Sequence, residues 1–201
     1  MRAYFAFCEA SAREDLMVSF PLNSDSVVMD VGGYHGDFAA KIYCRYGCKV
    51  VIFEPVREFH EIIRSRFRYN SDIEVVNAGA GRQARHVAIS KSHDASSIFT
   101  NGGDVEEIQI VSLLEYMDEH GYRAVDLFAI NIEGGEYELL DAAFENMERA
   151  NRFTNVLVQF HDFVENAVEM RASLRQRMLR THDLIWDFPF VWECWKRRER
   201  F

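Results

Sequence analysis

The stretch VVMDVGGYHGDF, residues 27–38, indicates how the chain begins to fold. Its apolar run Val27–Val31 leads into three glycines within five positions, and a helical pattern starts at Asp37. Glycines between a buried strand and a helix are typical of a ligand-binding turn, because glycine lets the backbone approach a ligand closely. The stretch therefore predicts a first strand, a binding turn and a helix.

Buried apolar runs alternate with helical patterns from this strand onward. We predict an α/β, Rossmann-like fold: about seven mostly parallel strands, helices on both faces and an antiparallel strand near the C-terminus. The further expected strands are Lys49–Phe53, Ile73–Val76, His86–Ile89, Glu107–Val111, Asp126–Ile132, Asn155–Phe160, Asp183–Phe188 and Phe190–Lys196. The expected helices include Asp37–Tyr46, Glu136–Ala150 and a long one after His161.

A chain of 201 residues is long enough to bury one sizeable core, so we expect a single domain, residues 1–201. Residues 27–161 would form its ligand-binding core, and residues 162–201 a helix and the last strands. With no separate substrate domain, residues 1–26 and the loop 91–106 are expected to cover the site as a lid.

Composition and charge narrow the class of protein. The net charge is −9, with the acidic excess in the main body. Gripping a nucleic-acid backbone needs many cationic contacts, so we expect no nucleic-acid partner. No apolar run approaches the ~18 residues of a membrane span, and residues 1–10 lack the pattern of a signal peptide. The four cysteines form no CxxC pair, so we expect reduced thiols in a cytoplasmic protein.

The residues around the glycine turn indicate its ligand. The pattern is Asp30-x-Gly32-x-x-x-Gly36, with Gly33 in between, and differs from the G-x-G-x-x-G of nicotinamide-binding turns. Asp30 would repel a pyrophosphate but suits a ligand that is cationic at this end. Glu54 follows the second strand, where a carboxylate can bind both hydroxyls of a ribose. Together the two carboxylates favour S-adenosylmethionine over NAD.

Six segments of the sequence form a further pattern: DVGGYHGDF (30–38), VIFEP (51–55), VVNAGAG (75–81), SS (96–97), LFAINIEGGEYELL (127–140) and VLVQFH (156–161). Together they resemble the FkbM-type methyltransferase family. The resemblance implies a class I methyltransferase fold that binds S-adenosylmethionine. The sequence departs from the family pattern at Ala129, where Lys is usual, and at Asn131, where Asp is usual.

The resemblance also implies a set of cofactor-binding residues. They are Asp30, Gly32, Gly33, Gly36, Glu54, Pro55, Asn77, Ala78, Ser96, Ser97 and Asn131. Asn77 would bind adenine or position its loop, although a turn-forming asparagine is a comparable explanation. Ser96 and Ser97 are equally well explained as ordinary loop hydroxyls.

Asn131, Glu133 and His161 are the candidates for catalysis, because they lie at the carboxyl ends of two expected neighbouring strands. A hydroxyl acceptor must lose its proton as its oxygen attacks a methyl group, and histidine suits that step near neutral pH. Glu133 would stabilise a sulfonium cation or orient the acceptor. We therefore predict methyl transfer to a hydroxyl of a small molecule, sugar or lipid. The alternative for His161 is a structural role between loops.

Two other functions remain as alternatives. A binding or regulatory module could keep the cofactor pocket but have lost catalysis, which the changes at Ala129 and Asn131 would allow. A nicotinamide-dependent oxidoreductase is disfavoured, because the G-x-G-x-x-G pattern is missing.

A metal site is not expected. Asn131, Glu133 and Asp162 carry the oxygen ligands that Mg²⁺ prefers. However, residues Asp162 to Glu165 have the spacing of a helix capping box, which explains Asp162 without a metal.

Overall fold

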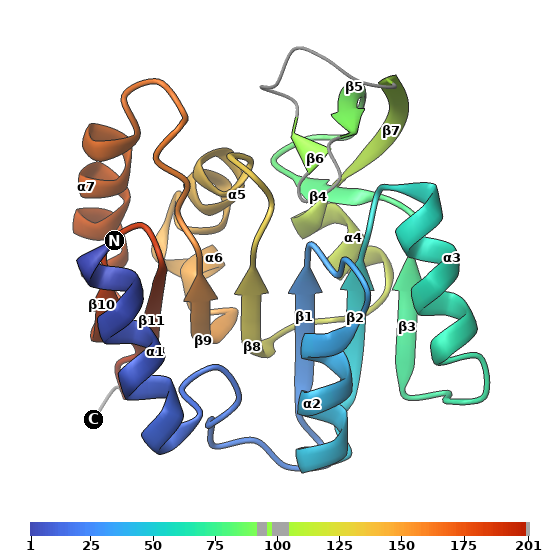
Figure 1. Cartoon of the computed structure of the whole chain (residues 1–201), viewed down its shortest axis with the longest axis horizontal. Helices are drawn as coiled ribbons and strands as arrows, with labels where there is room; N and C mark the ends of the chain where they lie inside the picture. Colours follow the sequence, from blue (N-terminus) through green and yellow to red (C-terminus); the bar gives the residue numbers. More distant parts are fainter. Residues whose placement is uncertain (92–95, 98–104, 200–201) are drawn as a thin grey trace.

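The structure, a computed structural model, describes residues 1–91, 96–97 and 105–199 (Figure 1). The strands of its larger sheet are Val27–Val31 (β1), Lys49–Phe53 (β2), Ile73–Val76 (β3), Val125–Ile130 (β8), Phe153–Val158 (β9), His182–Phe188 (β10) and Trp192–Arg197 (β11). Their order is β10-β11-β9-β8-β1-β2-β3. β11 pairs antiparallel with β9 and β10, whereas β1 pairs in parallel with β2 and β8. The predicted seven-stranded, mostly parallel sheet is confirmed.

β1 has β2 on one side and β8 on the other. The chain moves outward in one direction after β1 and later returns to its other side, and such a reversal opens a crevice at the carboxyl ends of the strands. Asp30 pairs with Ile52 of β2 and with Ala129 of β8, one residue before the end of β1 at Val31. The glycine turn therefore begins at the point where the strand order reverses.

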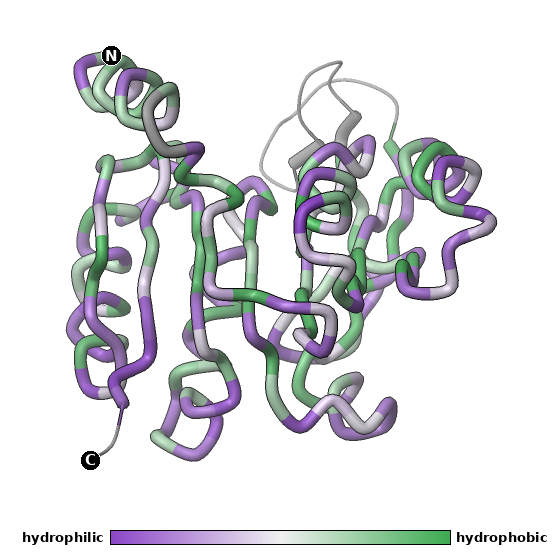
Figure 2. The backbone as a smooth tube through the Cα atoms, turned by 90° about the horizontal axis from the view of Figure 1, so that it is seen from below, coloured by the Kyte–Doolittle hydropathy of each residue, from purple (hydrophilic) through white to green (hydrophobic). Residues whose placement is uncertain are grey.

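Each face of the larger sheet carries its own helices. The helices are Asp37–Tyr46 (α2), Arg57–Arg66 (α3), Leu113–Glu119 (α4), Glu136–Ala143 (α5) and Ala167–Met178 (α7). Met29 and Val31 of β1 belong to a core shared with α4, α5 and α7, whereas Val28 belongs to a second core shared with α2 and α3. Figure 2 shows mostly hydrophobic strands beside helices of mixed polarity. Burial on both faces explains why the strands read as continuous apolar runs.

A smaller sheet stands beyond the carboxyl ends of β1 and β2 (Figure 1). Its strands are Gly79–Gly81 (β4), Arg85–Lys91 (β5), Ser96–Ser97 (β6) and Val105–Ser112 (β7), in the order β4-β7-β5-β6. The sequence predicted strands at 86–89 and 107–111. It did not reveal that they pair with each other, antiparallel, in a separate sheet.

The predicted helix Glu136–Ala150 is two helices. α5 ends at Ala143, and a short helix, α6, spans Met147–Ala150. Asn146 caps α6, since its side-chain oxygen accepts a hydrogen bond from the Arg149 N–H at 3.0 Å. A side chain that satisfies the free N–H groups of a new helix favours a restart over a continuous helix.

The predicted capping box at residues 162–165 is wrong. α7 begins at Ala167, and its N-cap is Asn166, which has a left-handed φ of 58°. Asparagine tolerates this conformation better than most residues, so the turn before α7 forms at Asn166 rather than at Asp162.

The N-terminal helix Arg2–Glu14 (α1) packs at the β10 end of the larger sheet. The ring of Phe7 contacts Trp186 and Phe188 of β10, with centroids 6.4 and 5.5 Å apart. Its role as a lid stays a prediction, and most of the loop 91–106 lies outside the described residues. No helix in the described part of the chain has the length and apolar character that crossing a bilayer requires.

Candidate active site

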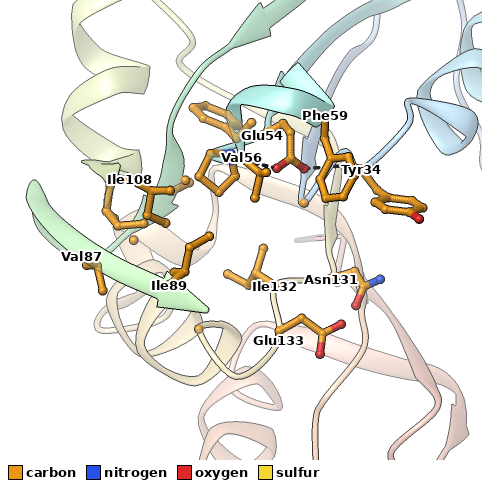
Figure 3. A pocket seen from close by; sticks show the side chains of 18 of the residues that line it. Tyr34, Glu54, Val56, Phe59, Val87, Ile89, Ile108, Asn131, Ile132 and Glu133 are labelled. Atoms are coloured by element: carbon orange, nitrogen blue, oxygen red, sulfur yellow. Dashed lines mark hydrogen bonds between the residues drawn. The ribbon is translucent and has the colours of Figure 1, made fainter. Parts of the chain in front are cut away.

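A cavity of about 220 Å³ lies between the carboxyl edge of the larger sheet and the smaller sheet (Figure 3). Five of the residues predicted from sequence line it: Gly32, Glu54, Pro55, Asn131 and Glu133. The structure thus brings the ends of β1, β2 and β8 together around one space, as the strand order requires.

The glycine turn is shaped by close backbone contacts. Gly32 has a left-handed φ of 96°, and a Cβ atom there would overlap the backbone carbonyl of Asn131. A Cβ atom on Gly33 would overlap the side chain of Ile52. Gly36 is the N-cap of α2. Two of the three glycines are therefore required by packing against neighbouring strands, and Gly32 also opens onto the cavity.

Glu54 ties the turn after β1 to the turn after β2. Its Oε2 accepts a hydrogen bond from the Tyr34 N–H at 2.8 Å, and its Oε1 accepts one from the Val56 N–H at 2.9 Å. The residue is only 4% exposed. Burial raises the pKa of Glu54 to about 7, although the two backbone hydrogen bonds oppose this rise.

Asp30 is a second buried carboxyl group beside Glu54. It is 5% exposed, and within the described residues its Oδ2 has no hydrogen-bond partner. Burial, and then the charge of Glu54, raise the pKa of Asp30 to about 8. At neutral pH the group therefore keeps its proton. A buried carboxyl oxygen without a partner is costly, and a cationic hydrogen-bond donor would satisfy it.

The aromatic rings of Tyr34 and Phe59 line the cavity, and the ring of His35 packs against both. Tyr34, which has a left-handed φ of 48°, stacks on His35 with the ring centroids 3.8 Å apart. Phe59 of α3 meets the Tyr34 ring edge-on, at 4.7 Å. The sequence did not single out Tyr34 or Phe59, because their approach depends on the turn conformation that Glu54 holds.

Among the remaining predicted cofactor residues, Asn77 acts on the loop that carries Glu54. Asn77 donates hydrogen bonds to the carbonyl oxygens of Glu54 and Pro55, at 3.1 and 3.2 Å, and so positions their loop. Ala78 is buried. Ser96 and Ser97 form β6, which pairs with the end of β5.

A histidine between two glutamates lies across from Glu54. His161, 8% exposed, follows β9; its Nδ1 lies 3.1 Å from Glu136 Oε1, and its Nε2 lies 3.5 Å from Glu133 Oε1. Burial alone would lower the pKa of His161, but hydrogen bonds to Glu133 and Glu136, together with their charges, raise it to about 9. The ring is therefore a cation at neutral pH. Glu133 lines the cavity, and His161 stands behind it.

The far wall of the cavity was missed by the sequence analysis. Aliphatic side chains of the smaller sheet form it: Val87, Ile89, Ile108 and Ile110 (Figure 3). Their alternation with polar residues predicted strands, but only the pairing of β5 with β7 turns these side chains toward the site. Within the described ranges, no three His, Cys, Asp or Glu side chains are grouped as metal ligands would be.

The family model described as the methyltransferase FkbM domain matches residues 30–181, which include every cavity-lining residue. The chain belongs to the FkbM methyltransferase family. The predicted family is thereby confirmed. No curated protein matches the sequence.

Solved structures of methyltransferases share the fold. A Streptococcus mutans protein assigned as a methyltransferase, solved in complex with SAH, has a TM-score of 0.59 at 7% identity, over 94% of this chain and 97% of that chain. A Clostridium thermocellum protein assigned as an rRNA methylase has a TM-score of 0.56 at 10% identity, over 94% and 97%. An rRNA methylase from Streptococcus thermophilus has a TM-score of 0.53 at 14% identity, over 94% and 95%. At such identities the likeness establishes the class I methyltransferase fold.

The prediction that excluded nucleic acid is wrong. Two of these three structures are described as rRNA methylases, so the fold and its acidic character do not exclude such a partner. The prediction relied on the net charge of the whole chain, whereas binding depends on the charge of one local surface.

Asp30→Asn should stabilise the ligand-free protein at high pH. A carboxyl group whose folded pKa lies above its unfolded value destabilises the fold increasingly as pH rises, here from about 4 to about 8. The variant should unfold at the same temperature as the parent near pH 4, and its advantage in stability should grow by about 1.4 kcal/mol for each pH unit up to about pH 8. Thermal unfolding across this range tests it, with exposed Asp25→Asn as the control. A variant less stable than the parent at pH 8 would contradict the assigned environment of Asp30.

Proposed function

We propose that this protein is an S-adenosylmethionine-dependent methyltransferase that methylates a hydroxyl oxygen of a small molecule, sugar or lipid. The observation that carries the proposal is the pair of buried carboxyl groups, Asp30 and Glu54, beside the glycine turn. Asp30 has an oxygen without a hydrogen-bond partner among the described residues, which suits an amino group or another cation, and Glu54 would bind the hydroxyls of a ribose. Membership of the FkbM family supports the same reading.

The residues around the cavity fit the parts of this cofactor. Asp30 would bind its cationic methionine end, Glu54 its ribose hydroxyls, and Pro55 and Val56 would lie beside its base. When bound, the cofactor supplies an activated methyl group, whose bond to sulfur breaks as the acceptor oxygen bonds to the methyl carbon. Holding the acceptor at attack distance accounts for most of the rate gain.

The acceptor proton requires a base, and His161 is our candidate. Its Nε2 faces Glu133, which lines the cavity, whereas its Nδ1 faces Glu136. Once Nε2 has lost its proton to solvent, it can take the proton of an acceptor hydroxyl that lies beside Glu133 and points its O–H at Nε2. Below the His161 pKa of about 9, the protonated ring instead pairs with Glu133 and holds that side chain in place.

The alternative function is a module that binds the cofactor in this cavity but does not catalyse methyl transfer. It rests on Ala129 and Asn131, which depart from the family pattern. Ala129 is buried within β8 and stands opposite Asp30, and Asn131 lines the cavity. With Ala129 and Asn131 at these positions, Glu133 still lines the cavity and His161 still contacts it. Of the two functions, only the methyltransferase gives a role to Glu133 and His161 as well as to Asp30 and Glu54.

Calorimetry should detect binding of S-adenosylmethionine and S-adenosylhomocysteine, and weak or no binding of NAD. Glu54→Ala should weaken cofactor binding by ~1.5–3 kcal/mol, the scale of hydrogen bonds to a charged group. Saturable NAD binding without an S-adenosylhomocysteine signal would rule out the methyltransferase proposal. Unchanged cofactor affinity in a folded Glu54 variant would show that the ribose lies elsewhere.

The rate of methyl transfer should rise with pH and level off near 9, because only the neutral form of His161 accepts a proton. The acceptor would first be found by screening hydroxylated metabolites, sugars, lipids and RNA with labelled cofactor. In single turnovers, His161→Ala should be slower by ~10²-fold or more and lose the inflection. His120→Ala, at the exposed end of α4, is the control. A parent profile that stays flat to pH 10 would exclude His161 as the base.

A further inference from the structure

Glu136 is a fully buried carboxylate that joins two loops of the candidate site. Its Oε2 accepts a hydrogen bond from the Gly134 N–H at 2.8 Å, in the turn after β8. Its Oε1 accepts one from the backbone N–H of His161 at 2.8 Å and lies 3.1 Å from Nδ1 of the same residue. One side chain thereby fixes both the turn that carries Glu133 and the ring behind it.

The turn after β8 needs such support. Glu133 has a φ of 50°, in the left-handed region, which is unfavourable for a non-glycine residue. The next residue, Gly134, also has a left-handed φ, of 103°, and its N–H is the group that Glu136 holds. This turn places the Glu133 side chain at the cavity, and the hydrogen bond from Gly134 to Glu136 stabilises it.

The two nitrogens of His161 have different surroundings. Nδ1 faces Glu136, which is inaccessible to solvent, while Nε2 faces Glu133, whose side chain is 26% exposed. The ring of Phe163 lies 5.3 Å away, and the hydroxyl of Tyr137 donates to the carbonyl oxygen of His161. If Nδ1 lost its proton, the Glu136 carboxylate would lose a hydrogen-bond donor. Because Glu136 is fully buried, solvent could not take the place of that donor.

We propose that Glu136 is a positioning residue for methyl transfer: it retains the Nδ1 proton of His161, and so makes Nε2 the nitrogen that accepts the acceptor's proton. This inference rests on the function proposed above and adds the group that determines which nitrogen reacts. Glu136 does not line the cavity, so it acts through His161 and Glu133 rather than on the substrate itself.

Nitrogen-15 NMR of the parent protein, labelled at histidine and titrated from pH 6 to pH 11, tests the proposal without any acceptor or cofactor. Assignment comes from the signal missing in His161→Ala. Above the transition, the Nε2 resonance should move to the position of an unprotonated nitrogen, while Nδ1 keeps its proton. A ring that keeps the proton on Nε2 instead would overturn the proposal.

Glu136→Gln gives a second test, since an amide cannot accept all three hydrogen bonds. The His161 transition should move down by more than ~1 pH unit, the effect of losing a neighbouring buried charge. The single-turnover rate at high pH should fall by ~10-fold or more, part of what a positioned base contributes. Glu165→Gln, which removes an exposed charge four residues from His161, should change neither. An unchanged transition in folded Glu136→Gln would refute the assigned role.

These measurements separate the two proposals. Should the protein fail to bind S-adenosylmethionine or to methylate any acceptor, the proposed function fails, whatever the tautomer. Should methyl transfer occur with the proton of neutral His161 on Nε2, the function stands and the role of Glu136 is wrong. If Glu136→Gln does not fold, the tautomer of the parent still decides.

Discussion

The burial of two carboxyl groups side by side, Asp30 and Glu54, is the constraint on which the rest of the site depends. Parallel pairing of β1 with β2 fixes the positions of both, and the glycines of the first turn let the backbone of Tyr34 reach the Glu54 carboxylate. Among the described residues no cation offsets their burial, which raises both pKa values. Burying two carboxyl groups lowers the stability of the fold, and a cationic ligand would offset that cost. Such a loss of stability is common at binding sites.

On the opposite side of the cavity, buried carboxylates are compensated by a neighbouring cation. There Glu133 and Glu136 are balanced by His161, whose pKa they raise. The Asp30 and Glu54 side thus holds carboxyl groups with raised pKa values that a cationic ligand would ionise, and the other side holds a histidine cation that can give up a proton to solvent. In our account the cofactor binds at the first of these sides, and the acceptor meets the second. The strained backbone at Tyr34 and Glu133 marks the turns at both sides.

Much of this arrangement could be predicted from sequence. The continuous apolar runs predicted the buried strands, and the spacing of Asp30, the glycines and Glu54 predicted the binding edge. What failed depended on contacts that the hydrophobic pattern does not show. The predicted helix that begins at Glu136 splits because Asn146 caps a second helix. The smaller sheet depends on the pairing of β5 with β7, which are distant in sequence, and the conformation of the turn at Glu133 depends on the hydrogen bond from Gly134 to Glu136. The exclusion of nucleic acid failed because composition averages over all surfaces.

The most direct test of the central claim is the number of protons released when S-adenosylmethionine binds at pH 7. Calorimetric titrations in buffers with different ionisation enthalpies measure it. A cation that pairs with the Asp30 carboxylate must displace its proton, so we predict the release of about one proton per site, given the raised pKa values of Asp30 and Glu54. The release should be lost in Asp30→Asn. Tight binding without proton release would contradict the account, because Asp30 would then remain neutral in the complex.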